Sequence, residues 1–255
     1  GIRHEFTRSP DSNADWTSDD EIYLDGQLEE KEYVRQGAYA QNHRHTVNAY
    51  YTGKVKDWTI DVNMDGMWYR NYEKDWNNST YQQVNQEEQT LLVTSTVHNT
   101  HHLYATKLVL THPLAGGTLS FGGEYSHSKR TNLFVNPQGI VADDDSYSKE
   151  GIASAFVEYG RQIGKASLQA GVRYEHVAFD YYIKNIHRKD MSRTTDDLFP
   201  SLGLSFPIGK VQMQLGYAKD ILRPSFSQLS GEVTYNNRYT YQTGNPLLLP
   251  MTTDN

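Results

Sequence analysis

Apolar residues recur at every second position along several stretches of about ten residues. The clearest run places Trp58, Ile60, Val62 and Met64 on one face and Thr59, Asp61, Asn63 and Asp65 on the other. Side chains of a β-strand point alternately to its two faces, so this period predicts a strand with one apolar face. The same pattern predicts four antiparallel hairpins, with strands at 45–52 and 58–65, 104–110 and 119–125, 153–159 and 168–174, and 202–206 and 211–217.

Short turns and long polar connections alternate along the chain. The turns within the hairpins fall at 53–56, 113–117, 162–165 and 207–210, whereas the connections at 71–100, 131–149 and 181–197 are long and hydrophilic. An acidic stretch at 11–32 is predicted to be a further extracellular loop. Short turns at one end and long loops at the other are typical of transmembrane β-barrels of the bacterial outer membrane.

The polar face of the predicted strands carries charges in mid-strand. They are Asp61, Asp65, Glu124, Glu158, Arg173 and Glu175. In a wide barrel such residues face a polar lumen. Aromatic residues near the strand ends, Trp58, Phe206, Trp68, Tyr69, Tyr125 and Tyr174, resemble the two interfacial girdles of such barrels. An ordinary soluble antiparallel sheet is the alternative interpretation.

Composition narrows the function classes. The 255 residues include no cysteine and carry a net charge of −7, and the mean hydropathy is −0.72. The sequence contains no run of eighteen apolar residues, so it does not predict a membrane-spanning helix. The negative charge argues against a nucleic-acid partner. The chain opens on strand-like residues without a signal peptide and stops without a closing element, so we expect it to be part of a longer protein.

Several short motifs resemble one family. They are Thr111-His112-Pro113-Leu114, Leu168 to Glu175, Leu198-Phe199-Pro200-Ser201, Arg223-Pro224-Ser225-Phe226 and Gly244-Asn245-Pro246 followed by Leu249-Pro250. As a set they resemble the outer-membrane β-barrel family of TonB-dependent receptors from Bacteroidota. The resemblance runs from about His45 onward, and it implies a structural role for Arg223, Pro224, Ser225, Gly244, Asn245 and Pro246.

The resemblance implies a barrel of about twenty-two strands filled by an N-terminal plug. Residues 1–255 would then be part of one outer-membrane barrel domain, of about nine or ten strands, with the signal peptide, plug domain and C-terminal strands not present. Its implied partners are outer-membrane lipid, the TonB complex through the plug region, and an imported nutrient ligand.

Candidate ligand-binding residues come from two patterns. Asp61, Asn63 and Asp65 form a polar row that could line a solute path. They match the opening of a calcium loop, but Tyr72 stands where its last carboxylate belongs, so a strand is preferred. The aromatic residues Trp68, Trp76, Tyr181 and Tyr239 could stack on a flat ligand, although girdle or loop packing is the preferred interpretation.

Metal, cofactor and catalytic signatures are weak. His98, His101 and His102 lie close in sequence, but no carboxylate or cysteine follows at ligand spacing, and we expect a solvated segment rather than a metal site. We predict no cofactor and no enzymatic activity, since no known catalytic motif occurs. The sequence therefore predicts a barrel segment of a TonB-dependent receptor that imports a scarce nutrient. A surface adhesin or a soluble β-sheet ligand-binding protein is the alternative, and the ligand stays open among glycan, peptide, metal chelate and cobalamin.

Overall fold

The computed structural model describes residues 1–231 and 233–255, and most of them lie in antiparallel β-strands. Its elements are β1 (Ile2–Leu24), β2 (Gln27–Val55), β3 (Trp58–Gln83), β4 (Gln89–Leu114), β5 (Gly117–Val135), β6 (Asp144–Ile163), β7 (Ala166–Ile183), β8 (Ile186–His187), β9 (Arg193–Ile208), β10 (Val211–Leu222), α1 (Phe226–Leu229), β11 (Val233–Asn237), β12 (Thr240–Thr243) and β13 (Met251–Asp254). Among the described residues, no helix is long and apolar enough to cross a membrane.

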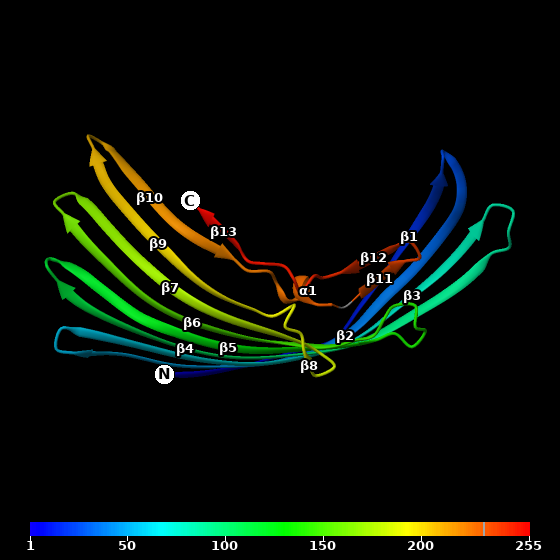
Figure 1. The fold of residues 1–255 in the computed structure, drawn as a ribbon, viewed down its shortest axis with the longest axis horizontal. Coiled ribbons are helices and arrows are strands. Elements are labelled where there is room, and N and C mark those ends of the chain that lie inside the picture. The colour runs from blue at the N-terminus through cyan, green and yellow to red at the C-terminus, as the bar shows by residue number, and fades with distance from the viewer. Residues whose placement is uncertain (232) are drawn as a thin grey trace.

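The strands form one curved, open antiparallel sheet. Ten of them follow the order β1-β2-β3-β4-β5-β6-β7-β9-β10-β13, and the two-residue β8 pairs with β7. Strands that are neighbours in sequence are therefore neighbours in space, as in an up-and-down barrel wall. The sheet curls around α1 and the separate β11–β12 hairpin, which lie on its concave side (Figure 1). The all-β antiparallel prediction is confirmed.

Register places the apolar residues on the convex face. One row runs across five strands through Ile60, Leu110, Phe121, Val157 and Val172. Val157 is 43% exposed and Val172 40% exposed in the sheet. Outer-membrane barrels turn such an apolar band toward lipid.

The turns inside the predicted hairpins contain two residues rather than four or five. Residues 56–57, 115–116, 164–165 and 209–210 separate the paired strands. Ala115 and Gly116 both have positive φ, of 48° and 76°, and Gly164 and Gly209 lie at 59° and 63°. Two-residue turns with positive φ match the right-handed twist of the strands, so the ladder continues closer to each turn than the sequence predicts.

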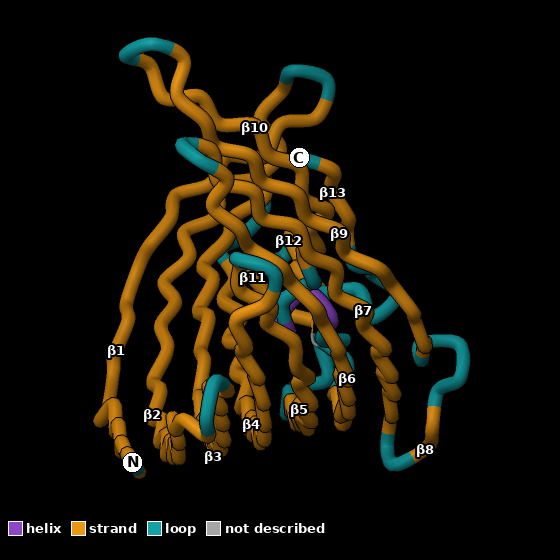
Figure 2. Tube along the Cα trace, turned by 90° about the vertical axis from the view of Figure 1, so that its left-hand side faces the viewer, coloured by secondary structure: helices purple, strands orange, loops and turns teal. Residues whose placement is uncertain are grey.

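The long loops expected at 71–100 and 11–32 are mostly strand, which corrects the sequence prediction. β2 has 29 residues and β3 and β4 have 26 each, whereas a barrel strand needs only about 10 to cross a bilayer. The hydrophobic pattern ends where the bilayer would end, but ladder hydrogen bonds do not require an apolar face. The hairpins thus extend far beyond the membrane band, and this extended part is called the outer end of the sheet (Figure 2).

Tyr69 does not belong to an aromatic girdle. It pairs with Arg44 and His101, whereas Trp68, its neighbour in sequence, lies on the other face. Trp68 donates a hydrogen bond from Nε1 to the hydroxyl of Tyr104 at 3.1 Å on the convex face. The girdle interpretation is therefore consistent with the position of Trp68, while Tyr69 lies on the concave face.

Candidate functional site

The connection between β10 and β13 folds back onto the concave face at the outer end of the sheet. Residues 223–250, here called the inner segment, contain α1 and the β11–β12 hairpin. Figures 1 and 2 show both elements inside the curve of the sheet. Nothing in the sequence predicts that residues 223–250 fold into the concave side of the sheet.

An ion pair fixes the tip of the β11–β12 hairpin to β2. Arg238 Nη1 lies 2.5 Å from Oε1 of Glu30, whose side chain is only 1% exposed. The guanidinium also lies 3.4 Å from the ring centroid of Tyr81, a cation–π arrangement. Burial acts to raise the pKa of Glu30, but hydrogen bonds from Arg238 and Tyr239 outweigh it and lower that pKa. Glu30 is therefore held as a carboxylate under the hairpin.

A second ion cluster fixes the start of the inner segment to β7. The carboxylate of Glu175 is 2% exposed and accepts a hydrogen bond from Arg173 at 2.6 Å. Arg223 forms an ion pair with the other oxygen of the same carboxylate. Leu229 of α1 packs with the buried Phe179 and Tyr181 next to this cluster. Charge pairing and apolar contact together hold α1 against the inner wall.

The motif residues at both ends of the inner segment meet one another. Ser225 caps α1, and it shares a reciprocal capping box with Gln228. The backbone N–H of Asn245 donates to the carbonyl of Gln228 at 2.6 Å. The carbonyl of Pro246 accepts a hydrogen bond from Arg193 at 3.3 Å. The expected structural role of these motif residues stays a prediction, and their geometry supports it.

Replacing Gly244 with alanine is expected to loosen the inner segment. An added Cβ would collide with the backbone oxygens of Ser227, Gln228 and Ser230, and backbone cannot move away as cheaply as a side chain. We expect the loss of roughly 1–3 kcal/mol of stability that is usual for overpacking. Hydrogen exchange of residues 226–245 should accelerate in full-length Gly244→Ala protein. Unchanged exchange would show that this close approach does not hold the segment.

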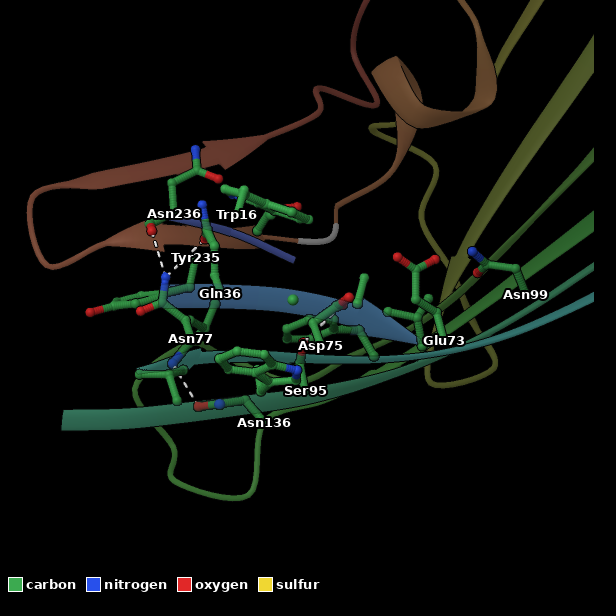
Figure 3. Close-up of a pocket in the computed structure, with 18 residues that line it drawn as sticks. Trp16, Gln36, Glu73, Asp75, Asn77, Ser95, Asn99, Asn136, Tyr235 and Asn236 are labelled. Atoms are coloured by element: carbon green, nitrogen blue, oxygen red, sulfur yellow. Dashed lines mark hydrogen bonds between the residues drawn. The ribbon is translucent and has the colours of Figure 1, made fainter. Parts of the chain in front are cut away.

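A cavity of about 250 Å³ separates the β11–β12 hairpin from the inner wall. Figure 3 shows the side chains that surround it. Asn77 of β3 closes one side, since its amide donates to Gln36 Oε1 at 3.0 Å and to the backbone oxygen of Asn236 at 2.7 Å. The apolar wall consists of Val93, Val97, Phe134 and Val141. The polar wall includes Glu73, Asp75, Ser95, Asn99 and Asn136.

The polar row predicted from the sequence lies nearer the short turns. Asn48 Nδ2 donates to Asn63 at 2.8 Å and to Asp65 at 2.7 Å, and Thr52 donates to Asp61 at 2.6 Å. On the concave face, Asn63 and Asp65 therefore share one hydrogen-bonded group with Asn48, and Asp61 pairs separately with Thr52. None of the three lines the cavity, and their ligand-binding role stays a prediction.

The four predicted aromatic residues are not brought together. Trp68 lies on the convex face against Tyr104, and Trp76 covers Gly37, its register partner, on the face opposite Asp75 and Asn77. Tyr181 is buried beside Phe179 and Leu229. Tyr239 follows Arg238 in the turn between β11 and β12.

The sequence candidates include Trp76, which lines the cavity, but not the polar residues of its lining, among them Gln36, Asn77, Asn99 and Asn136. The sequence signal that could have identified these residues is weak. It consists of polar residues at every second position in segments that follow the apolar alternation and that the sequence predicts to be loops.

The histidines also separate. Along β4, His98 and His102 lie on one face, and His101 lies on the other and accepts a hydrogen bond from Arg130 at 3.2 Å. Within the part of the chain that the structure describes, no group of three or more histidines or carboxylates could hold a metal ion.

Glu32 makes the fit of the hairpin dependent on pH. Its carboxyl is 2% exposed, and neither oxygen has a hydrogen-bond partner among the described residues by distance and angle. Burial raises the pKa of Glu32 above its usual 4.5. Protonated Glu32 therefore stabilises the docked hairpin. This contribution to stability is fully present below pH 4.5 and is lost as pH rises through the raised pKa of Glu32. Glu30 has the opposite effect, because its lowered pKa removes stability only as pH falls below about 4.5.

Replacing Glu32 with glutamine is expected to stabilise the docked hairpin at neutral pH by roughly 1–2 kcal/mol, since the amide is neutral in the buried site without taking up a proton. Hydrogen-exchange protection of residues 233–237 in the full-length protein should rise in Glu32→Gln. The matched variant Glu29→Gln changes an exposed neighbour and should leave protection unchanged. Equal protection in Glu32→Gln and the unmodified protein would contradict the role given to burial.

The curved sheet, its apolar convex band and its charged concave face define the wall of an outer-membrane β-barrel. A family model described as the outer membrane protein beta-barrel family matches residues 51–255. The chain belongs to that family, and the protein is located in the outer membrane. A comparison with curated proteins finds no match.

Several solved structures resemble the chain. The ferric citrate transporter FecA in its unliganded form is 8% identical with a TM-score of 0.44, and the match covers 76% of this chain and 36% of FecA. The copper transporter OprC is 11% identical with a TM-score of 0.49, covering 99% of this chain and 45% of OprC. The siderophore receptor PirA from Pseudomonas aeruginosa is 15% identical with a TM-score of 0.42, and the match covers 98% of this chain and 50% of PirA. The chain thus spans half or less of the length of these proteins.

Proposed function

We propose that this chain is part of the barrel of a TonB-dependent outer-membrane receptor that imports a scarce nutrient. The observation that carries the proposal is the concave face, where a charged wall is partly covered by an inner segment fixed to it through Glu30 and Glu175. A polar wall suits a passage for a water-soluble ligand. A segment that projects into that passage narrows it, as expected of a receptor that binds before it transports.

The motif set supports the same proposal. Arg223 and Ser225 begin the inner segment, and Gly244 to Pro246 fold against α1 and Arg193. These residues carry the resemblance to TonB-dependent receptors of Bacteroidota, and here they shape the element that narrows the lumen. The proposal includes one barrel domain across residues 1–255, with a signal peptide and plug upstream, further strands downstream, a TonB complex as partner, and no enzymatic activity.

Uptake in the source organism tests the proposal. A strain lacking the gene is grown on a panel of single limiting nutrients, and the nutrient with a growth defect is supplied in labelled form. We expect accumulation in the parent strain to require this gene, TonB and the proton-motive force. Accumulation that persists without TonB would identify a passive channel. A deletion that changes only cell adhesion would favour the adhesin.

A further inference from the structure

Three asparagines lie side by side on the inner wall at one end of the cavity. The register pairs Asn71 of β3 with Asn99 of β4, and Asn99 with Asn132 of β5. The Asn71 amide donates to Glu73 Oε2 at 3.3 Å, and the Asn132 amide donates to Asp144 Oδ2 at 2.8 Å. The amide nitrogens of the two outer asparagines are thus oriented by carboxylates.

Two carbonyl oxygens in this row are buried without a partner. Within residues 1–231 and 233–255, neither Asn99 Oδ1 nor Asn132 Oδ1 accepts a hydrogen bond, and Asn132 is only 1% exposed. A buried acceptor without a donor costs about 1–3 kcal/mol, and most native structures avoid it. Asn99 lines the cavity and Asn132 is its register partner on β5. The cavity therefore presents a carbonyl acceptor that a ligand with a hydrogen-bond donor can satisfy.

The rest of the lining restricts the charge of that donor. Glu73 lies beside Asn99, and Asp75 and Ser95 lie farther along the same wall of the cavity (Figure 3). Among the described residues that line the cavity, none is a lysine, arginine or histidine. An anion would therefore meet two carboxylates and no compensating charge, which low local dielectric makes costly. A neutral or positively charged donor meets acceptors only.

Size and apolar contact restrict the ligand further. The volume of about 250 Å³ is below the range of roughly 300–1,000 Å³ for drug-sized ligands. Val93, Val97 and Phe134 form one wall, and Trp16 and Tyr235 bring aromatic rings to the rim. A single ring or a short chain with an apolar face fits this combination.

We propose that the cavity under the β11–β12 hairpin binds a small, donor-rich ligand without negative charge, and that Asn99 accepts a hydrogen bond from it. Hydroxyl groups of a polyol or sugar ring and the ammonium group of an amine share this chemistry. The inference rests on the proposed receptor function in so far as this ligand, or one unit of it, is what the receptor imports.

Binding to the purified full-length protein tests the site. Isothermal titration in detergent uses glucose and N-acetylglucosamine as polyols, putrescine as the amine and citrate as the anion. The variant Asn99→Leu removes the acceptor at similar size. Asn78→Leu is the matched control, because Asn78 lies on the opposite face of β3 and is exposed.

We expect a polyol or putrescine to bind, Asn99→Leu to weaken that binding by at least tenfold, and Asn78→Leu to leave it unchanged. Asn99→Asp distinguishes an amine ligand from a polyol ligand, because an added carboxylate tightens putrescine binding and leaves glucose binding unaltered or weaker. Binding of citrate in preference to the other probes would overturn the proposal, as would absence of binding by all four or insensitivity to Asn99→Leu.

The outcome for this site is separable from that for the receptor. Titration needs neither TonB nor a membrane potential. If the purified protein binds the ligand but cells show no TonB-dependent uptake of it, the proposed function is refuted and the binding site stands. TonB-dependent uptake that is equal in Asn99→Leu and unmodified strains, without binding in titration, would refute the site alone.

Discussion

Replacing Arg238 with methionine is expected to release the β11–β12 hairpin from the inner wall of the sheet. Glu30 would keep its buried position without the guanidinium that lies 2.5 Å away. Removing one partner of a buried ion pair typically costs 3–5 kcal/mol, because the remaining charge is left uncompensated. We expect about 3 kcal/mol, at the lower end, because Arg238 itself remains 21% exposed.

The release should appear as local opening rather than global unfolding. Asn77 and Asn236 share the hydrogen bond that ties the hairpin to β3, so exchange protection of residues 233–243 should fall in Arg238→Met. Protection within β6 and β7 should stay as in the unmodified protein, since those strands pair over their whole length. Stability would then be lost in the hairpin alone.

Two further variants separate charge from packing. The double variant Glu30→Gln with Arg238→Met removes both charges and should recover most of the lost protection. Lys31→Met breaks the exposed pair with Glu21 and should have no measurable effect on the hairpin. A double variant as unprotected as Arg238→Met would mean that the contact of Arg238 with Tyr81, rather than its charge, holds the hairpin.

Replacing Val157 with arginine is expected to destabilise the membrane-inserted barrel by roughly 2–4 kcal/mol, the cost of a cation on the lipid face near the bilayer midplane. Val157 stands in the apolar row between Phe121 and Val172. It lies seven residues from Gly164 in the turn, which places it near the middle of a band roughly 25 Å tall. Arginine there must reach an interface or draw water into the bilayer.

The matched control is Ser154→Arg on the neighbouring part of the same strand. Ser154 faces the lumen and pairs with Glu124 of β5, whose side chain is 37% exposed, so an arginine there stays on the polar face beside a partly exposed carboxylate. Folding of the full-length protein into lipid vesicles, followed by denaturant titration, should show a large loss for Val157→Arg and little for Ser154→Arg. Equal losses would mean that the convex face does not contact lipid.

Much of the wall follows from the sequence alone. The alternation of Trp58, Ile60, Val62 and Met64 with Asp61, Asn63 and Asp65 assigns the two faces of β3 correctly, because a period of two leaves no other arrangement once one face meets lipid. The glycines at 116, 164 and 209 mark three short turns correctly, since their φ values of 76°, 59° and 63° are costly for other residues.

The sequence is less informative where neither lipid nor a hydrophobic core selects one face. β3 and β4 continue through Asn77, Thr90 and their neighbours with polar residues on both faces, so periodicity loses its contrast and the strands resemble loops. The histidines show the same limit: their spacing suggests a cluster, but the pleat directs His101 away from His98 and His102.

The hydrophobic alternation by itself determined the apolar part of the strands, the places of the short turns and the division between lipid and lumen, because each depends on residues close together in the chain. The cavity and its anchors were decided only by the tertiary structure. Glu30 and Arg238 are 208 positions apart, and Asn77 and Asn236 are 159 apart. No local pattern links such residues, because their contact exists only after the sheet has curved and residues 223–250 have folded into its concave side.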